Sequence, residues 1–311
     1  MGAVIPQRRI RGRKLSRYRR VDEDKTITLE DIYKNRVLTA KDKEILLALY
    51  YHRCLTSNQL AEMFYLYRKD GKKNLMRSAQ ESIRRRLRKL FDWKVIERFF
   101  PPAPENEGSM PQHVVLDTLG ANIVAGLLGT TIKKLDWRYE MTETKLPYLD
   151  HMVEVNDFYI YLLRAARENG HKVKNFRVEN HNRHEFKINN YKKVILQPDA
   201  YGQYWIDDDT GFHFFLEWDR GTMTPQQFSG KYNRYYNFLI SDECKRIYGN
   251  MPPVVLTVTP DAERAYELYR TIYAVNTEIN WLFAPKPLVE TKILEQIWIG
   301  KEGTPVSLLE L

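Results

Sequence analysis

The chain has 311 residues, 43% of them hydrophobic and 13% aromatic, and its 49 lysines and arginines against 40 aspartates and glutamates give a net charge of +9. This length and apolar content suffice for two compact domains. Its two cysteines, Cys54 and Cys244, are too few for a disulfide framework and lack the spacing of a zinc site, which favours a reducing cytoplasm. No apolar run approaches the roughly 18 residues of a transmembrane helix. We therefore expect a cytoplasmic protein with no membrane partner.

The positive charge is concentrated in two segments. Residues 1–20 carry eight basic and no acidic residues, and residues 72–98 carry ten basic and three acidic ones. The rest of the chain is net acidic, so a polyanion would bind these two segments first. We expect residues 1–37 to form a flexible basic arm, because so charged a segment cannot build a core of its own. Its candidate DNA contacts are Arg8, Arg9, Arg11 and Arg13, and a solubilising tail or a targeting sequence is the alternative.

Residues 38–129 have the pattern of a winged helix-turn-helix domain. Three capping boxes predict the starts of three helices, namely Thr39 with Asp42, Thr56 with Gln59, and Ser78 with Glu81. Two short strands, Val95–Phe100 and His113–Leu116, are expected to flank a proline-rich loop and form the wing. Two glutamates at the tip of this loop, Glu105 and Glu107, weaken the case that the wing binds phosphate.

The third helix is predicted to separate an apolar stripe from a polar face. Leu87, Leu90 and Phe91 fall within about 80° of Ile83 on a helical projection. The candidate DNA-binding residues of this helix are Ser78, Ser82, Arg84, Arg85, Arg88 and Lys89. A solvated basic face is the plainer interpretation, but the preceding helices favour contact with double-stranded DNA.

The second half predicts a mixed sheet with helices on its faces, so the chain as a whole is expected to be α+β or α/β. Residues 130–146 are polar and weakly periodic and are predicted to link the first domain to a second one at 147–311. The expected elements are a helix at 148–169, strands at 173–178, 194–205 and 212–218, a helix at 225–240, a strand at 254–258, a helix at 261–274 and a strand near 281–283.

Three carboxylates are predicted to gather at one end of a hairpin in this sheet. A turn at Asp207–Gly211 would place Asp199 close to Glu217, and Asp219 would leave the same face of its strand two residues later. Like charges so close are costly without a cation or a shared proton. We therefore expect these three residues to hold Mg²⁺, or to hold no metal and pair instead with Arg220, Lys231 or backbone amides.

Several short motifs resemble the replication-relaxation family. Its C-terminal signature is similar to Pro198-Asp199, Glu217–Thr222, Lys231 and Tyr235 here, and its N-terminal half to Leu38–Asp42, Leu55–Leu60, Arg86–Leu90, His151 and Asn156. The resemblance covers about Leu38 to Tyr236. It implies a plasmid or mobile-element protein that acts in replication and DNA relaxation through a winged-helix DNA-binding domain.

The second half also resembles the PD-(D/E)xK nuclease superfamily, in which carboxylates bind Mg²⁺ and a lysine helps to activate water. Here Asp219 stands where that pattern has its lysine, and Lys231 on the following helix is the candidate replacement, with Glu154 as an additional acid. Asp199, Glu217, Asp219 and Lys231 are thus the candidate catalytic residues. Metal-dependent cleavage or nicking is one hypothesis. The other is a DNA-binding initiator, accessory factor or transcriptional regulator whose nuclease-like domain serves binding or homodimerisation.

Other polar and aromatic residues of the second half are expected to have structural roles. His181 and His184 fall in a polar loop at 180–190 and are predicted to be exposed rather than bound to metal. His151 and Asn156 are expected to make hydrogen bonds within the domain. Three tyrosines of one helix, Tyr232, Tyr235 and Tyr236, are expected to pack against the sheet, with stacking on bases as the alternative.

Overall fold

The computed structural model describes residues 28–34, 38–66, 75–100, 110–140, 146–188, 192–274 and 278–311. The chain divides into two compact units, the first ending at Asn156 and the second beginning at Asp157. The long helix α6 (Leu146–Asn169) passes from one unit into the other. None of the helices in these residue ranges is long and apolar enough to cross a membrane. The predicted domain limits at 37, 129 and 146 stay a prediction.

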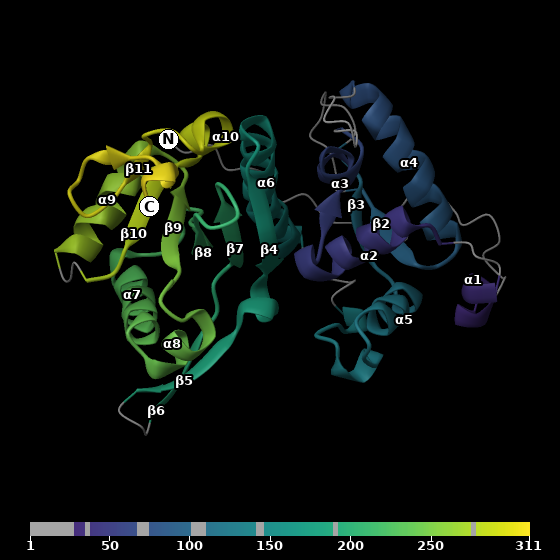
Figure 1. The fold of residues 1–311 in the computed structure, drawn as a ribbon, viewed down its shortest axis with the longest axis horizontal. Helices are drawn as coiled ribbons and strands as arrows, with labels where there is room; N and C mark the ends of the chain where they lie inside the picture. The colour runs from purple at the N-terminus through teal and green to yellow at the C-terminus, as the bar shows by residue number, and fades with distance from the viewer. Residues whose placement is uncertain are drawn as a thin grey trace. The chain divides into compact units, whose positions relative to one another are not determined.

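The first unit combines short helices with a small antiparallel sheet (Figure 1). Its elements are α1 (Leu29–Lys34), α2 (Ala40–His52), β1 (Leu55–Thr56), α3 (Ser57–Phe64), α4 (Met76–Asp92), β2 (Ile96–Phe99), β3 (His113–Leu116) and α5 (Thr118–Leu127). The strand order is β1-β3-β2, with Leu55 opposite Val114 and Phe99 opposite His113. The three expected helices and the two expected strands are therefore present.

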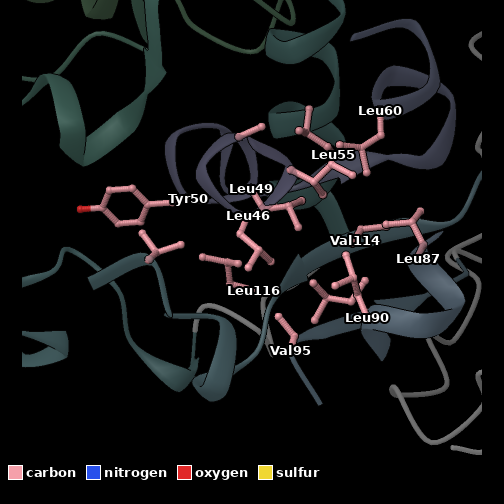
Figure 2. Packing of buried hydrophobic residues seen from close by; sticks show 14 of the residues in the cluster. Leu46, Leu49, Tyr50, Leu55, Leu60, Leu87, Leu90, Val95, Val114 and Leu116 are labelled. Carbon is pink, nitrogen blue, oxygen red and sulfur yellow. The ribbon is translucent and has the colours of Figure 1, made fainter. Parts of the chain in front are cut away.

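Apolar side chains from α2, α3, α4 and the sheet form one core. Figure 2 shows Leu46 and Leu49 of α2 facing Leu87 and Leu90 of α4, with Val114 of β3 among them. All five are at most 1% exposed. This is the apolar stripe that the helical spacing predicts, and its burial fixes which side of α4 faces solvent.

Two of the three predicted capping boxes are confirmed. The hydroxyls of Thr39 and Thr56 each accept a hydrogen bond from the backbone N–H three residues on, and the backbone N–H of each threonine donates the reciprocal bond to the side chain of Asp42 or Gln59. The box predicted at Ser78 is wrong, because α4 begins at Met76 and its N-cap, Leu75, makes no side-chain bond. Met76 packs against the core and Ala79 is buried, so apolar contacts extend the start of the helix to two residues before Ser78.

The second unit is built on a seven-stranded sheet of order β12-β11-β10-β9-β8-β7-β4. Its strands are β4 (Lys172–Val178), β7 (Ala200–Trp205), β8 (Gly211–Trp218), β9 (Val254–Thr259), β10 (Trp281–Pro285), β11 (Trp298–Ile299) and β12 (Pro305–Val306). β8, β9 and β10 run parallel, and the remaining neighbours are antiparallel. The mixed sheet expected from the order of elements is thus confirmed.

Helices α7 (Pro225–Leu239), α8 (Asp242–Tyr248) and α9 (Ala262–Tyr273) cover one face of this sheet (Figure 1). Phe228 and Tyr235 of α7 pack there against Phe215 of β8 and Trp281 of β10. Phe158 of α6 packs against Phe214 and Trp298 on the other face. A short helix, α10 (Lys286–Lys292), follows β10.

The strand predicted at 194–205 is in fact two strands. β6 (Lys192–Leu196) pairs with β5 (His184–Ile188) in a separate hairpin, and β7 begins at Ala200 in the main sheet. Pro198 lies between them, and because proline has no N–H to donate, it ends the pairing of β6. β5 and a 3₁₀ turn at Glu179–Asn182 replace the expected polar loop.

The predicted exposure of His184 is also wrong. Its ring lies 4.6 Å from the ring of Phe238, centroid to centroid, and its Nε2 lies 3.3 Å from the hydroxyl of Tyr248. Burial lowers the pKa of His184 to about 4, so the imidazole is neutral at pH 7. The alternation of His184, Phe186 and Ile188 is that of a half-buried strand.

Candidate functional site

The outer face of α4 presents two arginines that have no acidic partner among the described residues. Arg84 and Arg85 are exposed, and neither forms an ion pair with any of the residues that the structure describes. Ser78 is exposed on the same helix and Ser82 is half-buried. Arg8, Arg9, Arg11 and Arg13 of the arm lie outside the described residues.

Arg86 has a different role from its two neighbours. Its Nε and Nη2 both donate to the carboxylate of Asp42, which is fully buried at the start of α2, and Nη2 also donates to Thr39 Oγ1 at 2.9 Å. The bond to Asp42 raises the pKa of the Arg86 guanidinium. Arg86 therefore ties α4 to the first turn of α2, and Asp42 also completes the capping box of that helix.

Arg88 and Lys89 contact residues at the C-terminal end of α4. Arg88 Nε donates to Asp92 Oδ2 at 2.8 Å, and its side chain is 33% exposed, so it does not stand free of acids as the helical projection predicts. The ammonium of Lys89 lies 4.3 Å from the ring centroid of Trp93. Of the predicted cations on α4, Arg84 and Arg85 are thus the two most available to a ligand.

The register of the central hairpin in the second unit brings Asp199 to Glu217. Ala200 pairs with Leu216, so Asp199 precedes β7 at the level of Glu217 in β8. Asp199 Oδ2 accepts a hydrogen bond from the Trp218 N–H at 2.8 Å. The predicted approach of these two acids is therefore confirmed.

Glu217 is held by two residues of α7. Lys231 Nζ donates to Glu217 Oε2, and the hydroxyl of Tyr235 donates to Glu217 Oε1. The Glu217 side chain is 1% exposed and that of Lys231 19% exposed. One turn of helix separates Lys231 from Tyr235, so both reach the same carboxylate. Lys231 thus lies where the sequence places its replacement cation.

Burial dominates the electrostatics of this cluster. It raises the pKa of Glu217 to about 7, Lys231 opposes this shift, and the nearby Asp199 adds to it. Burial disfavours the charge on Lys231, but the carboxylates of Glu217 and Asp199 outweigh it and raise its pKa. Near neutral pH the cluster therefore contains a carboxyl group poised to gain or lose a proton.

This shift predicts a pH dependence of stability. Glu217 has a folded-state pKa above its unfolded value of 4.5, so the folded protein binds the proton more tightly. Its contribution to the free energy of unfolding is fully present below about pH 4.5 and is lost as pH rises towards 7. The melting temperature of wild type minus that of Glu217→Gln, measured from about pH 4.5 to 8, should fall across this range. A flat or rising difference would contradict the assignment.

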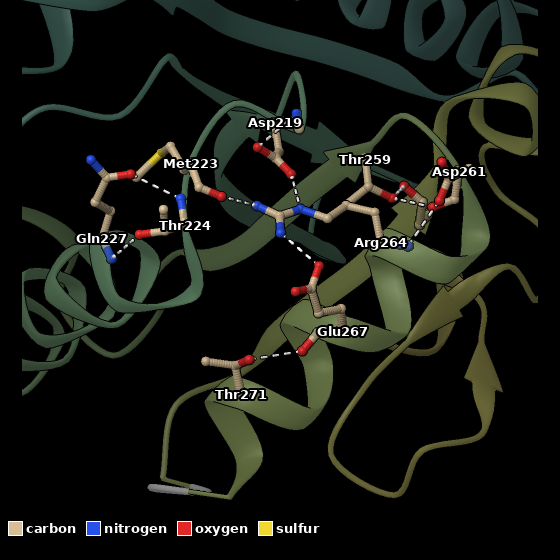
Figure 3. Close-up of polar contacts among 11 residues, drawn as sticks. Asp219, Met223, Thr224, Gln227, Thr259, Asp261, Arg264, Glu267 and Thr271 are labelled. Carbon is tan, nitrogen blue, oxygen red and sulfur yellow. Dashed lines mark hydrogen bonds and ion pairs between the residues drawn. The ribbon is translucent and has the colours of Figure 1, made fainter. Parts of the chain in front are cut away.

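Asp219 is separated from this cluster by its own partner. Arg264 of α9 donates from Nε to Asp219 Oδ2 at 2.7 Å, from Nη1 to Glu267 at 2.7 Å and from Nη2 to the Met223 carbonyl at 2.7 Å, as Figure 3 shows. The other Asp219 oxygen accepts from the Gly221 N–H at 3.1 Å. The expected gathering of three carboxylates is thus not seen. Across the described ranges no group of three or more His, Cys, Asp or Glu residues has a geometry that could hold a metal.

The cluster lies at the edge of the sheet where ligands commonly bind. Glu217 sits near the carboxyl end of β8, opposite Thr257 of the parallel strand β9. Lys286 follows the end of β10, and its ammonium lies 5.6 Å from the ring centroid of Trp218. In open α/β sheets, ligands bind outside the carboxyl ends of parallel strands, so this edge is the favoured location for chemistry.

The expected packing of two tyrosines is confirmed, whereas the hydrogen bonds expected for Asn156 within the second domain are made instead to residues of the first unit. Asn156 is fully buried, donates to the carbonyls of His52 and Cys54, and its Oδ1 lies 2.7 Å from His52 Nδ1. Burial lowers the pKa of His52 to about 4. Tyr232 and Tyr235 are buried against the sheet. They are therefore not available to stack on bases.

Sequence reasoning missed the ion pair of Arg264 with Asp219 and that of Arg86 with Asp42. Arg264 of the amphipathic helix α9 follows Asp219 by 45 positions, and 44 positions separate Asp42 from Arg86. No local spacing signals either pair. The one available signal is the uncompensated acid, because a buried Asp42 or Asp219 requires a cation from elsewhere in the chain.

These features define a two-unit protein with an arginine-bearing helix in one unit and a buried carboxylate and lysine at a sheet edge in the other. A family model described as replication-relaxation matches residues 46–254, about two thirds of the chain. The chain therefore belongs to the replication-relaxation family, whose name indicates a role in replication or relaxation of DNA. No curated protein and no solved structure matches the chain.

Proposed function

We propose that this protein binds double-stranded DNA and acts in the replication or relaxation of a plasmid or mobile element. The first unit has the element order of a winged helix-turn-helix, with α3 and α4 as the helical pair and β2 and β3 as the strands of the wing. Gln80 of α4 donates to Asn58 of α3 at 2.9 Å and helps to fix their mutual orientation. The exposed arginine pair Arg84 and Arg85 carries this proposal, because nothing in the described chain neutralises it.

The double variant Arg84→Ala/Arg85→Ala tests this function. We expect duplex affinity to fall about tenfold or more, and the slope of log K against log salt to flatten by about 0.9 for each phosphate that the variant no longer neutralises. The matched control is Arg270→Ala, an exposed arginine of α9. Arg264 is unsuitable as a control because its side chain is 13% exposed and binds Asp219. Equal losses in the control and in the double variant would contradict docking through α4.

The second candidate function is metal-dependent phosphodiester cleavage or nicking by the second unit. The convergence of Asp199, Glu217 and Lys231 favours it, because two carboxylates beside a lysine are what such chemistry requires. Asp199 and Glu217 would supply oxygen donors to Mg²⁺ once Glu217 exchanged its bond from Lys231 or Tyr235 for the ion, and the bound ion would polarise a phosphoryl oxygen. Asp219 fits less well, since Arg264 already neutralises it. Lys231 would hold a water or a phosphate oxygen near Glu217. Nicking of supercoiled plasmid tests this function.

A further inference from the structure

The outer face of α7 differs from an ordinary solvated helix face. No aspartate or glutamate occurs between Pro225 and Leu239. Gln227, Gly230, Asn233 and Arg234 are exposed. These positions fall within about 120° on the helical projection, so they form one continuous surface. It carries amides, a glycine and one arginine, and no negative charge.

Gly230 is the unusual member of this surface. It lies in the interior of α7, where glycine is less favourable than alanine. A Cβ added at Gly230 would meet nothing within 4 Å, so no packing in the described part of the chain requires the glycine. A close approach by the backbone of another molecule is a role that glycine serves at such a position.

Charge complementarity indicates what that molecule is. Arg234 follows Gly230 by one helical turn, is exposed, and has no ion pair among the described residues. Its positive charge opposes the upward shifts in the pKa of the neighbouring Lys231 and Tyr235. With no acid on α7, this surface attracts an anionic chain, and a phosphodiester backbone supplies both the charge and the close approach.

We propose that the outer face of α7, defined by Gln227, Gly230, Asn233 and Arg234, binds the backbone of duplex DNA. Gly230 allows the sugar-phosphate chain to approach the helix, Arg234 neutralises a phosphate, and Asn233 supplies an amide donor. Lys231, which is 19% exposed, borders this face on the helical projection and binds the buried Glu217, so a strand bound here would lie next to the lysine of that cluster. The inference rests on the proposed function in taking DNA as the ligand, but it assigns a second surface in the other unit.

The test uses the full chain and a labelled duplex in fluorescence anisotropy across a salt series. Gly230→Ala should raise the melting temperature by about 2–4 °C, because alanine favours the helix, and yet weaken binding about threefold or more. Arg234→Ala should weaken binding and flatten the salt slope by about 0.9. The matched controls are Gly126→Ala, at an exposed glycine of α5, and Arg270→Ala. Both should leave affinity unchanged.

The outcomes separate this inference from the function on which it rests. Unchanged affinity and salt slope in both Gly230→Ala and Arg234→Ala would overturn the α7 surface. If Arg84→Ala/Arg85→Ala still weakened binding, the proposed function would stand without it. Loss of binding through α7 variants alone would instead overturn docking through α4. If Gly230→Ala lowered the melting temperature, the binding of Arg234→Ala would test the α7 surface instead. Unchanged affinity and salt slope in that variant would overturn it.

Discussion

Replacing Arg86 with alanine should destabilise the first unit by about 3 kcal/mol, although the same change at Arg85 should cost less than about 0.5 kcal/mol. Arg86 binds both oxygens of Asp42, a carboxylate with no solvent exposure. Without the guanidinium, that carboxylate stays buried beside only its capping partners. Arg85 has no such partner in the described chain, so its removal leaves no charge uncompensated.

Chemical denaturation of wild type, Arg86→Ala and Arg85→Ala measures this difference, with far-UV circular dichroism as the probe. A double variant, Asp42→Asn/Arg86→Leu, separates the effect of the buried charge from that of side-chain packing. The side-chain oxygen of an asparagine can still accept the capping-box bond from the Thr39 N–H, and no unpaired charge remains, so most of the stability should return. If Arg86→Ala and Arg85→Ala proved equally stable, the assignment of Arg86 to the scaffold would be wrong. In every case, the DNA affinities of Arg86→Ala and Arg85→Ala should be compared only after both variants are shown to be folded.

This division among neighbouring arginines shows how far the sequence alone could reach. The stripe of Ile83, Leu87 and Leu90 recurs at helical spacing, so periodicity alone predicts which side of α4 is buried. Periodicity cannot predict that Arg86, at the border of that stripe, has an acid 44 positions earlier as its partner. Such contacts depend on tertiary packing.

The same distinction applies to the sheet of the second unit. The turn after β7 could be predicted because Asp207 accepts hydrogen bonds from the N–H groups of Asp209 and Thr210, a local interaction typical of aspartate. That turn sets the register which brings Asp199 to Glu217. The division of the strand predicted at 194–205 was missed, although Pro198 is a local signal for it. Short elements such as α8 and α10, each of seven residues, are too brief to show a period.

The candidate site was predicted in part for a physical reason. Asp199 and Glu217 lie on paired strands, and strand pairing follows from one turn. Lys231 and Tyr235 come from a helix whose position depends on how α7 packs on the sheet. Motif resemblance suggested them, but spacing alone did not. Asp219 shows the opposite case. Strand alternation predicts that it joins Glu217, but β8 ends at Trp218 and Arg264 of α9 neutralises Asp219.

If the second unit cleaves DNA, Glu217→Gln and Asp199→Asn should each lower the rate of plasmid nicking on the order of 10³-fold. Both changes remove a negative oxygen donor from a site where a metal would supply several kcal/mol of transition-state stabilisation. Lys231→Ala should lower the rate about 10²-fold or more if its ammonium positions the attacking water or a phosphate oxygen. The measurement is conversion of supercoiled to open-circular plasmid with Mg²⁺ or Mn²⁺, before and after addition of EDTA.

The matched control for these variants is Asp209→Asn, which removes an exposed carboxylate from the turn between β7 and β8. It should nick at the wild-type rate. Circular dichroism must show that Glu217→Gln is folded, because Lys231 loses its buried counter-ion in that variant. Nicking that persists in both carboxylate variants, or its absence from wild type on every DNA tested including the cognate origin, would refute cleavage by this cluster. The Glu217 and Lys231 pair would then serve to hold α7 against β8, with DNA binding as the activity of the chain.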